Sequence, residues 1–103
     1  MNRKGIDEPI KVITVCGVGM GSSLILRMTA EKALSEMGVK ARVEATDLSS
    51  AKSMAADVIL GQEMHTDQLD GAAPVVVGIT NFMDTEGLKQ KLEGPLREQG
   101  WLE

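Results

Sequence analysis

Three short apolar runs and one alternating run are spaced along the chain. Continuous apolar runs of this length are typical of strands that are buried on both faces of a sheet. They predict strands over residues 10–16, 57–61 and 74–80. In residues 39–46, apolar and charged positions alternate, which predicts an edge strand with one face in water.

The first two segments between these strands have helical spacing. After the first strand, Ser22 or Ser23 is expected to cap a helix, and Gly38 is expected to end it. A second, short helix is expected from Asp47 to about residue 55. Residues 62–70 are ambiguous, and one or two turns of helix are the interpretation that the pattern allows.

A last helix is expected to begin at residues 84–86 and to carry Leu88, Leu92 and Leu96 on one face. We expect it to be disturbed at residues 94–95, Gly-Pro, because proline lacks the backbone N–H and its ring collides with the preceding turn. Strand and helix therefore alternate along the whole chain.

This alternation predicts an α/β fold with a parallel sheet and helices on both faces. We expect one three-layer αβα domain over residues 10–103, flavodoxin-like or Rossmann-like, with four strands in the order 2-1-3-4. Residues 1–9 are expected to be a flexible polar segment. Ligands of such sheets lie beyond the carboxyl ends of the strands, where the winding direction reverses. That point falls beside the first strand, which is expected to end at Cys16.

Cys16 is the only cysteine, and a loop rich in glycine and serine follows it. A thiolate is the reactive form of cysteine, and a helix N-terminus lowers the pKa of a thiol. Glycines also let successive amides turn inward around an anion, and serine hydroxyls add donors. Cys16 is therefore the candidate nucleophile. The candidate phosphate-binding residues are Gly17, Val18, Gly19, Met20, Gly21, Ser22 and Ser23.

Several other interpretations of this loop stay open. A lone cysteine is often only a small buried side chain. A small cysteine-dependent phosphatase is disfavoured, because the arginine that would clamp a phosphoester is replaced by Ser22 and the nearest arginine is Arg27. A non-catalytic module that binds an anion or a nucleotide is the other alternative, although the third glycine of a dinucleotide fingerprint would fall at Ser22.

Composition narrows the classes of partner. The chain has 103 residues, and 43% of them are hydrophobic, which is enough for one core. A net charge of -4 and an aromatic content of 2% argue against nucleic acid as a ligand. No apolar run approaches the roughly 20 residues that span a bilayer, and residues 1–9 do not resemble a signal peptide. We expect a cytoplasmic protein, and the sequence predicts neither a metal site nor a cofactor.

The run VCGVGMGSSLILRM, residues 15–28, resembles the phosphocysteine loop of enzyme IIB components of the bacterial phosphoenolpyruvate-dependent sugar phosphotransferase system. The form Cys-Gly-x-Gly-x-Gly-Ser-Ser is most similar to ascorbate-type IIB proteins, with galactitol-type IIB as a near relative. Residues 56–60 and 76–83 correspond to the third and fourth strands of those proteins. The resemblance covers roughly residues 10–99.

The resemblance implies a phosphoryl relay. Cys16 would accept a phosphoryl group from a phosphohistidine of enzyme IIA, and Gly17 to Ser23 would cradle it. Cys16 would then donate the group to a sugar held by the membrane transporter, enzyme IIC. For an ascorbate-type protein this sugar is L-ascorbate. The chain would thus lie at the inner membrane through enzyme IIC, without a membrane span of its own.

Other residues near the predicted strand ends have simpler explanations. Helix capping accounts for Asp47 and Asp84, and a lone His65 in a polar segment is more often solvated than catalytic. An exposed apolar rim for docking IIA and IIC is one interpretation of three apolar residues, and the alternative is a core position, because methionine at helical spacing usually belongs to a core. The rim residues would be Met20, Leu24 and Met28. The remaining polar residues at the predicted strand ends are Gln62, Glu63 and Asn81.

Overall fold

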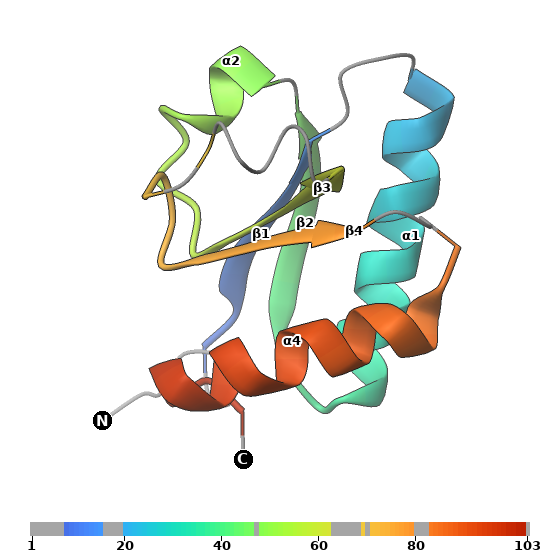
Figure 1. The fold of residues 1–103 in the computed structure, drawn as a ribbon, viewed down its shortest axis with the longest axis vertical. Helices are drawn as coiled ribbons and strands as arrows, with labels where there is room; N and C mark the ends of the chain where they lie inside the picture. The colour runs from blue at the N-terminus through green and yellow to red at the C-terminus, as the bar shows by residue number, and fades with distance from the viewer. Residues whose placement is uncertain are drawn as a thin grey trace.

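The computed structural model of the chain describes residues 8–15, 20–46, 48–62, 69, 71–79 and 83–102. Strands and helices alternate as the sequence predicts from residue 10 to residue 62, and a helix follows the last strand (Figure 1). In chain order, the elements are β1 (Ile10–Val15), α1 (Met20–Glu36), β2 (Ala41–Thr46), α2 (Leu48–Ala51), β3 (Val58–Gln62), β4 (Val75–Ile79) and α4 (Thr85–Gln99).

The strands form one parallel sheet in the order β2-β1-β3-β4, which confirms the predicted topology. β1 lies in the interior of the sheet, and its last residue, Val15, is in register with Thr46 of β2 and Gly61 of β3. All four strands point the same way, so their carboxyl ends share one edge of the sheet, which we call the carboxyl edge. The winding reverses there, between β1 and β3.

Side-chain alternation along β1 divides the core into two layers. Ile10 and Val12 belong to the larger cluster, with Leu26 of α1 and Leu92 of α4. Ile13 and Val15 belong to a second cluster, which includes Ala51 of α2. Figure 1 shows α1 and α4 close together, with α2 apart from them. Helices therefore cover both faces of the sheet, as the three-layer prediction requires.

Two helix boundaries differ from the sequence-based expectation. α1 begins at Met20, so Ser22 and Ser23 lie in its first turn and do not cap it. Only residues 16–19 separate Val15 from α1, and so short a connection starts the helix close to the strand end. α2 ends at Ala51 and does not reach residue 55, where Ala55 has a φ of 51°, a left-handed conformation that cannot continue a helix.

The expected disturbance of α4 at Pro95 is wrong, because the helix continues to Gln99. Gly94 has no Cβ, and this removes part of the collision that disfavours helical backbone before a proline. The last turn is also held by buried Leu96, whose carbonyl accepts the N–H of Trp101 at 2.9 Å. Gly100 ends the helix with a φ of 78°.

Asp57 anchors the amino end of β1. Its carboxylate accepts the backbone N–H of Lys11 at 2.8 Å, and its own N–H donates to the Lys11 carbonyl at 2.8 Å. The Lys11 ammonium reaches the carbonyl of Met54, also at 2.8 Å. These bonds tie β1 to the segment that leads into β3, and thereby fix the strand that runs to the predicted site.

Asp84 caps α4, as the sequence suggests, and it also explains a glycine in the first turn of that helix. Its carboxylate accepts the Gly87 N–H at 2.9 Å, and a Cβ on Gly87 would lie 2.8 Å from the Asp84 carboxyl carbon. Alanine usually favours a helix by about 0.8–1.0 kcal/mol over glycine. We nevertheless expect Gly87→Ala to leave the free energy of unfolding nearly unchanged, because the methyl group displaces a cap worth about 1 kcal/mol and this loss offsets the gain in helix propensity. Denaturant titration measures this change.

The control is the same substitution without the capping carboxylate. In an Asp84→Ala background, Gly87→Ala should raise the free energy of unfolding by up to about 1 kcal/mol, because only helix propensity then acts. If Gly87→Ala raised the free energy of unfolding equally in both backgrounds, the steric conflict with Asp84 would be disproved.

An ionic contact joins α1 to α4. The Lys89 ammonium lies 2.9 Å from a Glu36 carboxylate oxygen and 3.0 Å from one of Glu86. The hydrogen bond from Lys89 lowers the pKa of Glu36, and the bonds to Glu36 and Glu86 raise the pKa of Lys89. A lowered carboxyl pKa stabilises the fold above the unfolded pKa, and this stabilisation is lost as the pH falls through the folded pKa.

We therefore expect Lys89→Met to be less stable than the parent chain at neutral pH. The difference should shrink as the pH falls below the ordinary glutamate pKa of about 4.3. It should also shrink as the pH rises through the raised pKa of Lys89. Thermal unfolding of both chains across this pH range measures the effect, and a difference that stays constant with pH would contradict it.

Candidate functional site

The predicted site lies where β1 passes into α1 at the carboxyl edge. The chain leaves β1 at Val15 and enters α1 at Met20, next to the point where the winding of the sheet reverses. Cys16, Gly17, Val18 and Gly19 lie outside the described residues, so their predicted roles stay predictions. The backbone of Met20, Gly21, Ser22 and Ser23 is described, and it forms the first turn of α1.

The first turn of α1 has the electrostatic character that an anion site requires. The first backbone N–H groups of a helix have no partner within the helix, and the helix dipole adds a partial positive charge there. No acidic residue occurs in the first turn of α1 to neutralise this charge. The N–H groups of Met20, Gly21 and Ser22 are thus suited to an anion. Ser22 supplies a backbone N–H group from within the turn, where the sequence predicts a capping hydroxyl.

The strand that precedes Cys16 is held firmly. Ile13, Thr14 and Val15 are all fully buried. Thr14 is a polar residue in an apolar strand, and its hydroxyl donates a long bond of 3.5 Å to the carbonyl of Glu44 on β2. Sequence reasoning did not single out Thr14, although a lone hydroxyl two residues before the cysteine was a visible signal. Its bond links β1 to β2 close to the carboxyl edge.

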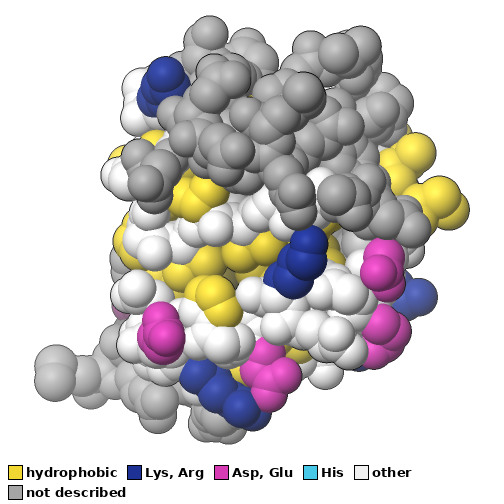
Figure 2. Space-filling view, viewed as in Figure 1, with side chains coloured by type: hydrophobic (Ala, Val, Ile, Leu, Met, Phe, Trp, Pro, Cys, Tyr) yellow, Lys and Arg dark blue, Asp and Glu magenta, His cyan; other side chains and the backbone are white. Residues whose placement is uncertain are grey.

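The first half of α1 exposes large apolar side chains. The exposed fractions are 53% for Leu24, 44% for Ile25 and 62% for Met28, and we call these residues the α1 rim. Hydrophobic side chains protrude in Figure 2 on the side where α1 lies in Figure 1. Leu24 and Met28 are therefore surface residues. The side chain of Met20 lies outside the described part of the chain.

The structure adds two apolar surface residues that sequence reasoning missed. Ile25 belongs to the α1 rim, and Met83, just before α4, is 76% exposed. The sequence pattern could have indicated the exposure of Ile25, because this residue lies outside the apolar positions that predict the buried face of its helix. Met83 follows the carboxyl end of β4 in the chain, so it adds apolar surface near the same edge of the sheet.

The other candidate side chains divide into two groups. Asp84 caps α4 through the Gly87 N–H, which accounts for it structurally. Gln62 is the last residue of β3, and only its backbone is described. The remaining candidates, which lie outside the described residues, are Asp47, Glu63, His65 and Asn81.

Within residues 8–15, 20–46, 48–62, 69, 71–79 and 83–102, no group of three or more His, Cys, Asp or Glu side chains could hold a metal ion. Over the same segments, none of the helices combines the length and the hydropathy that crossing a membrane requires.

Comparison with known proteins agrees with this geometry. The family model described as "PTS system, Lactose/Cellobiose specific IIB subunit" matches residues 11–94, from β1 into α4. The chain is also 35% identical over 89 residues to a Mycoplasma pneumoniae protein named "Ascorbate-specific PTS system EIIB component". That alignment covers 84% of this chain and 94% of the relative. The chain therefore belongs to the lactose/cellobiose-specific IIB subunit family, the phosphotransferase components of the sugar phosphotransferase system (PTS).

Proposed function

We propose that Cys16 is a phosphoryl carrier between a phosphohistidine of enzyme IIA and a sugar held by enzyme IIC. The observation that carries the proposal is its place in the chain. The only cysteine directly follows the buried central strand β1, and α1 begins four residues later with a first turn free of acidic residues. Membership of the IIB family supports the same role for this residue.

The relay consists of two substitutions at phosphorus. In the first, the Cys16 thiolate attacks the phosphorus, the N–P bond of the phosphohistidine breaks, and its electron pair returns to the imidazole. In the second, a sugar hydroxyl oxygen attacks, the S–P bond breaks, and the cysteine leaves as a thiolate while the hydroxyl proton is released. Both steps require in-line positioning and stabilisation of the phosphoryl oxygens more than additional covalent chemistry.

The glycine and serine loop supplies that stabilisation in our proposal. The N–H groups of the first turn of α1 donate to phosphoryl oxygens, together with the amides from Gly17 onward. The chain lacks an arginine at the position of Ser22, where a cysteine phosphatase would place its clamp. Phosphocysteine hydrolysis is therefore slow, and the group survives until a sugar arrives.

The proposed substrate is L-ascorbate, delivered by an ascorbate-type enzyme IIC. The support is the name of the 35% identical relative, "Ascorbate-specific PTS system EIIB component". The family model carries the broader description of lactose and cellobiose. Since the sugar is held by IIC, the choice of sugar is made by the IIC partner and not by Cys16.

We further propose that residues 10–103 act as one IIB module at the cytoplasmic side of the inner membrane, bound there through IIC. The larger hydrophobic cluster supports a single module, because it extends from Ile10 to Trp101. The α1 rim and Met83 provide the apolar surface for docking IIA and IIC in turn. They belong to segments that begin at the carboxyl edge, where Cys16 lies in the chain.

Phosphoryl transfer tests the role of Cys16. We expect the chain to gain one phosphate when it is incubated with phosphoenolpyruvate, the general phosphotransferase proteins and an ascorbate-type IIA. The label should then pass to L-ascorbate when membranes that contain the matching IIC are added. Intact-mass measurement detects the first step, and chromatography of the labelled sugar detects the second.

Cys16→Ser is the matched variant, and it should stay unlabelled while its thermal unfolding matches that of the parent chain. A parent chain that remains unlabelled would overturn the carrier proposal. Continuous turnover of p-nitrophenyl phosphate would indicate a phosphatase instead. Transfer to lactose or cellobiose through their own IIC, without transfer to ascorbate, would refute only the choice of sugar.

The docking role of the α1 rim has a separate test. We expect Met28→Glu to lower kcat/KM for phosphorylation by IIA at least about tenfold, because a charge would be desolvated in the interface. Gln99→Glu adds the same charge to an exposed position at the end of α4 and should leave the rate unchanged. Equal rates for the two variants in a stopped transfer assay would place the docking surface elsewhere.

A further inference from the structure

The outer edge of β2 is a second surface with specific features. β2 ends the sheet, and among the described strands only β1 pairs with it. The Ile10 N–H donates to the Lys40 carbonyl at 3.0 Å, so the Lys40 carbonyl faces β1. Backbone groups of a strand alternate in direction, and the N–H and C=O groups of Ala41, Val43 and Ala45 therefore face outward.

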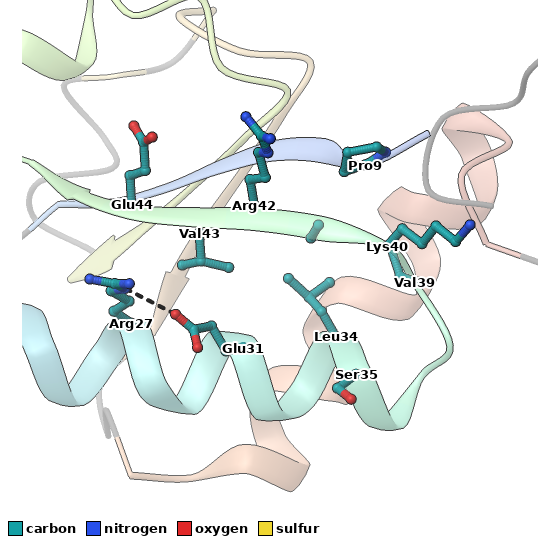
Figure 3. A pocket seen from close by; sticks show the side chains of 11 residues that line it. Pro9, Arg27, Glu31, Leu34, Ser35, Val39, Lys40, Arg42, Val43 and Glu44 are labelled. Carbon is teal, nitrogen blue, oxygen red and sulfur yellow. Dashed lines mark hydrogen bonds and ion pairs between the residues drawn. The ribbon is translucent and has the colours of Figure 1, made fainter. Parts of the chain in front are cut away.

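The space beside this edge is open. A groove of about 810 Å³ runs between β2 and α1. Residues 39–44, which lead into β2 and form its first four positions, line one side of the groove. The α1 side of the groove includes Arg27 and Glu31, which pair with each other at 2.9 Å (Figure 3). The groove is lined by residues from both faces of β2, so it reaches around the strand edge. A further strand therefore has access to the outward backbone groups.

The charges on β2 are self-complementary. Arg42 and Glu44 project from one face of the strand, whereas Val43 projects from the other, toward α1 (Figure 3). Both charged side chains are exposed. In an antiparallel pair, residues directly opposite each other point to the same face and their side chains interact.

We propose that the outer edge of β2 pairs antiparallel with β2 of a second copy of this chain, with Val43 opposite Val43. Ala41 then lies opposite Ala45 of the second copy, so every outward-facing residue of β2 belongs to a hydrogen-bonded pair. Arg42 lies opposite Glu44 of the second copy, and Glu44 opposite Arg42. These charged residues form non-hydrogen-bonded pairs, in which opposing side chains are closest.

The charges select this register over its neighbours. A shift in one direction sets Arg42 opposite Arg42, and a shift in the other sets Glu44 opposite Glu44, and like charges directly opposite each other are unfavourable. Both shifts also leave an outward-facing residue of β2 without a partner inside the strand. The register centred on Val43 therefore satisfies the backbone groups and the charges together.

The opposite edge of the sheet differs. Lys91 of α4 donates its ammonium group to the carbonyl of Gly78 on β4, at 3.0 Å. A lysine placed over a sheet edge is one way in which proteins prevent further strand pairing. No such side-chain bond to Ala41, Val43 or Ala45 of β2 occurs within the described residues. The two edges are thus unlike, and β2 is the edge that accepts a strand.

The pairing leaves the carboxyl edge of each copy accessible. Antiparallel β2 strands point the carboxyl edges of the two copies toward opposite ends of a joined sheet. The proposal is therefore independent of the role of Cys16, and a failure of either leaves the other standing.

Sedimentation of the full chain over about 10 μM to 1 mM, where small interfaces associate, tests the proposal. We expect a monomer–dimer equilibrium in the parent chain. Arg42→Glu and Glu44→Arg should each raise the dissociation constant about tenfold or more, because each reversal sets like charges opposite each other in both cross-strand pairs. The double variant Arg42→Glu/Glu44→Arg exchanges the charges and should restore dimerisation.

Glu98→Lys is the control: it reverses an exposed charge on α4, away from β2, and should change the dissociation constant less than twofold. Circular dichroism should show that all of the variants remain folded. A parent chain that is monomeric throughout would overturn the proposal and leave the edge to a different protein. A dimer that is insensitive to both single reversals, or one that the double variant fails to restore, would also overturn it.

Discussion

Strand β1 is hydrogen-bonded on both edges, to β2 and to β3. It is also packed on both faces, against α1 and α4 on one face and against the second cluster, which includes Ala51 of α2, on the other. A shift of its register by one residue would move its buried side chains to the wrong layer. Lys11 and Asp57 hold its amino end through paired backbone and carboxylate bonds. The end of the strand at Val15 is therefore fixed in direction and depth. Everything proposed for the adjoining cysteine depends on that fixed point.

On the other side of residues 16–19, α1 is also held in place by the core. Its buried face, with Leu26, Ala30 and Leu34, belongs to the main cluster, while Lys89 ties its last turn to α4 through Glu36. Residues 16–19 thus connect two elements that are both held by the core. An anionic group bound there would face the positive end of the α1 dipole. Because the core already fixes the position of α1, the helix would not need to move in order to stabilise that charge. The α1 rim lies on the same helix, so a partner docked on it would be held at a fixed position relative to residues 16–19.

The two edges of the sheet have different surroundings for a physical reason. β4 packs under α4, and a long side chain of that helix, Lys91, can reach its outer carbonyl. β2 has α1 beside it, but the neighbouring charges Arg27 and Glu31 bind each other and leave a groove. Phosphoryl transfer at the carboxyl edge and strand pairing at the β2 edge would use separate surfaces, so one chain can support both.

The strand order follows from the sequence by itself, because apolar runs separated by helical patterns allow few topologies. This order puts the end of β1, which Cys16 follows in the chain, beside the point where the winding of the sheet reverses. The role of Asp84 as a cap was also readable, since it depends on its own turn. Contacts between distant segments decided the rest. The start of α1 at Met20 depends on how close the core brings the helix to β1, and the passage of α4 through Pro95 depends on the burial of the flanking leucines. Only the tertiary structure could show that Met28 faces water, because periodicity reveals that a helix has an apolar face but not which apolar side chains the core has room to bury.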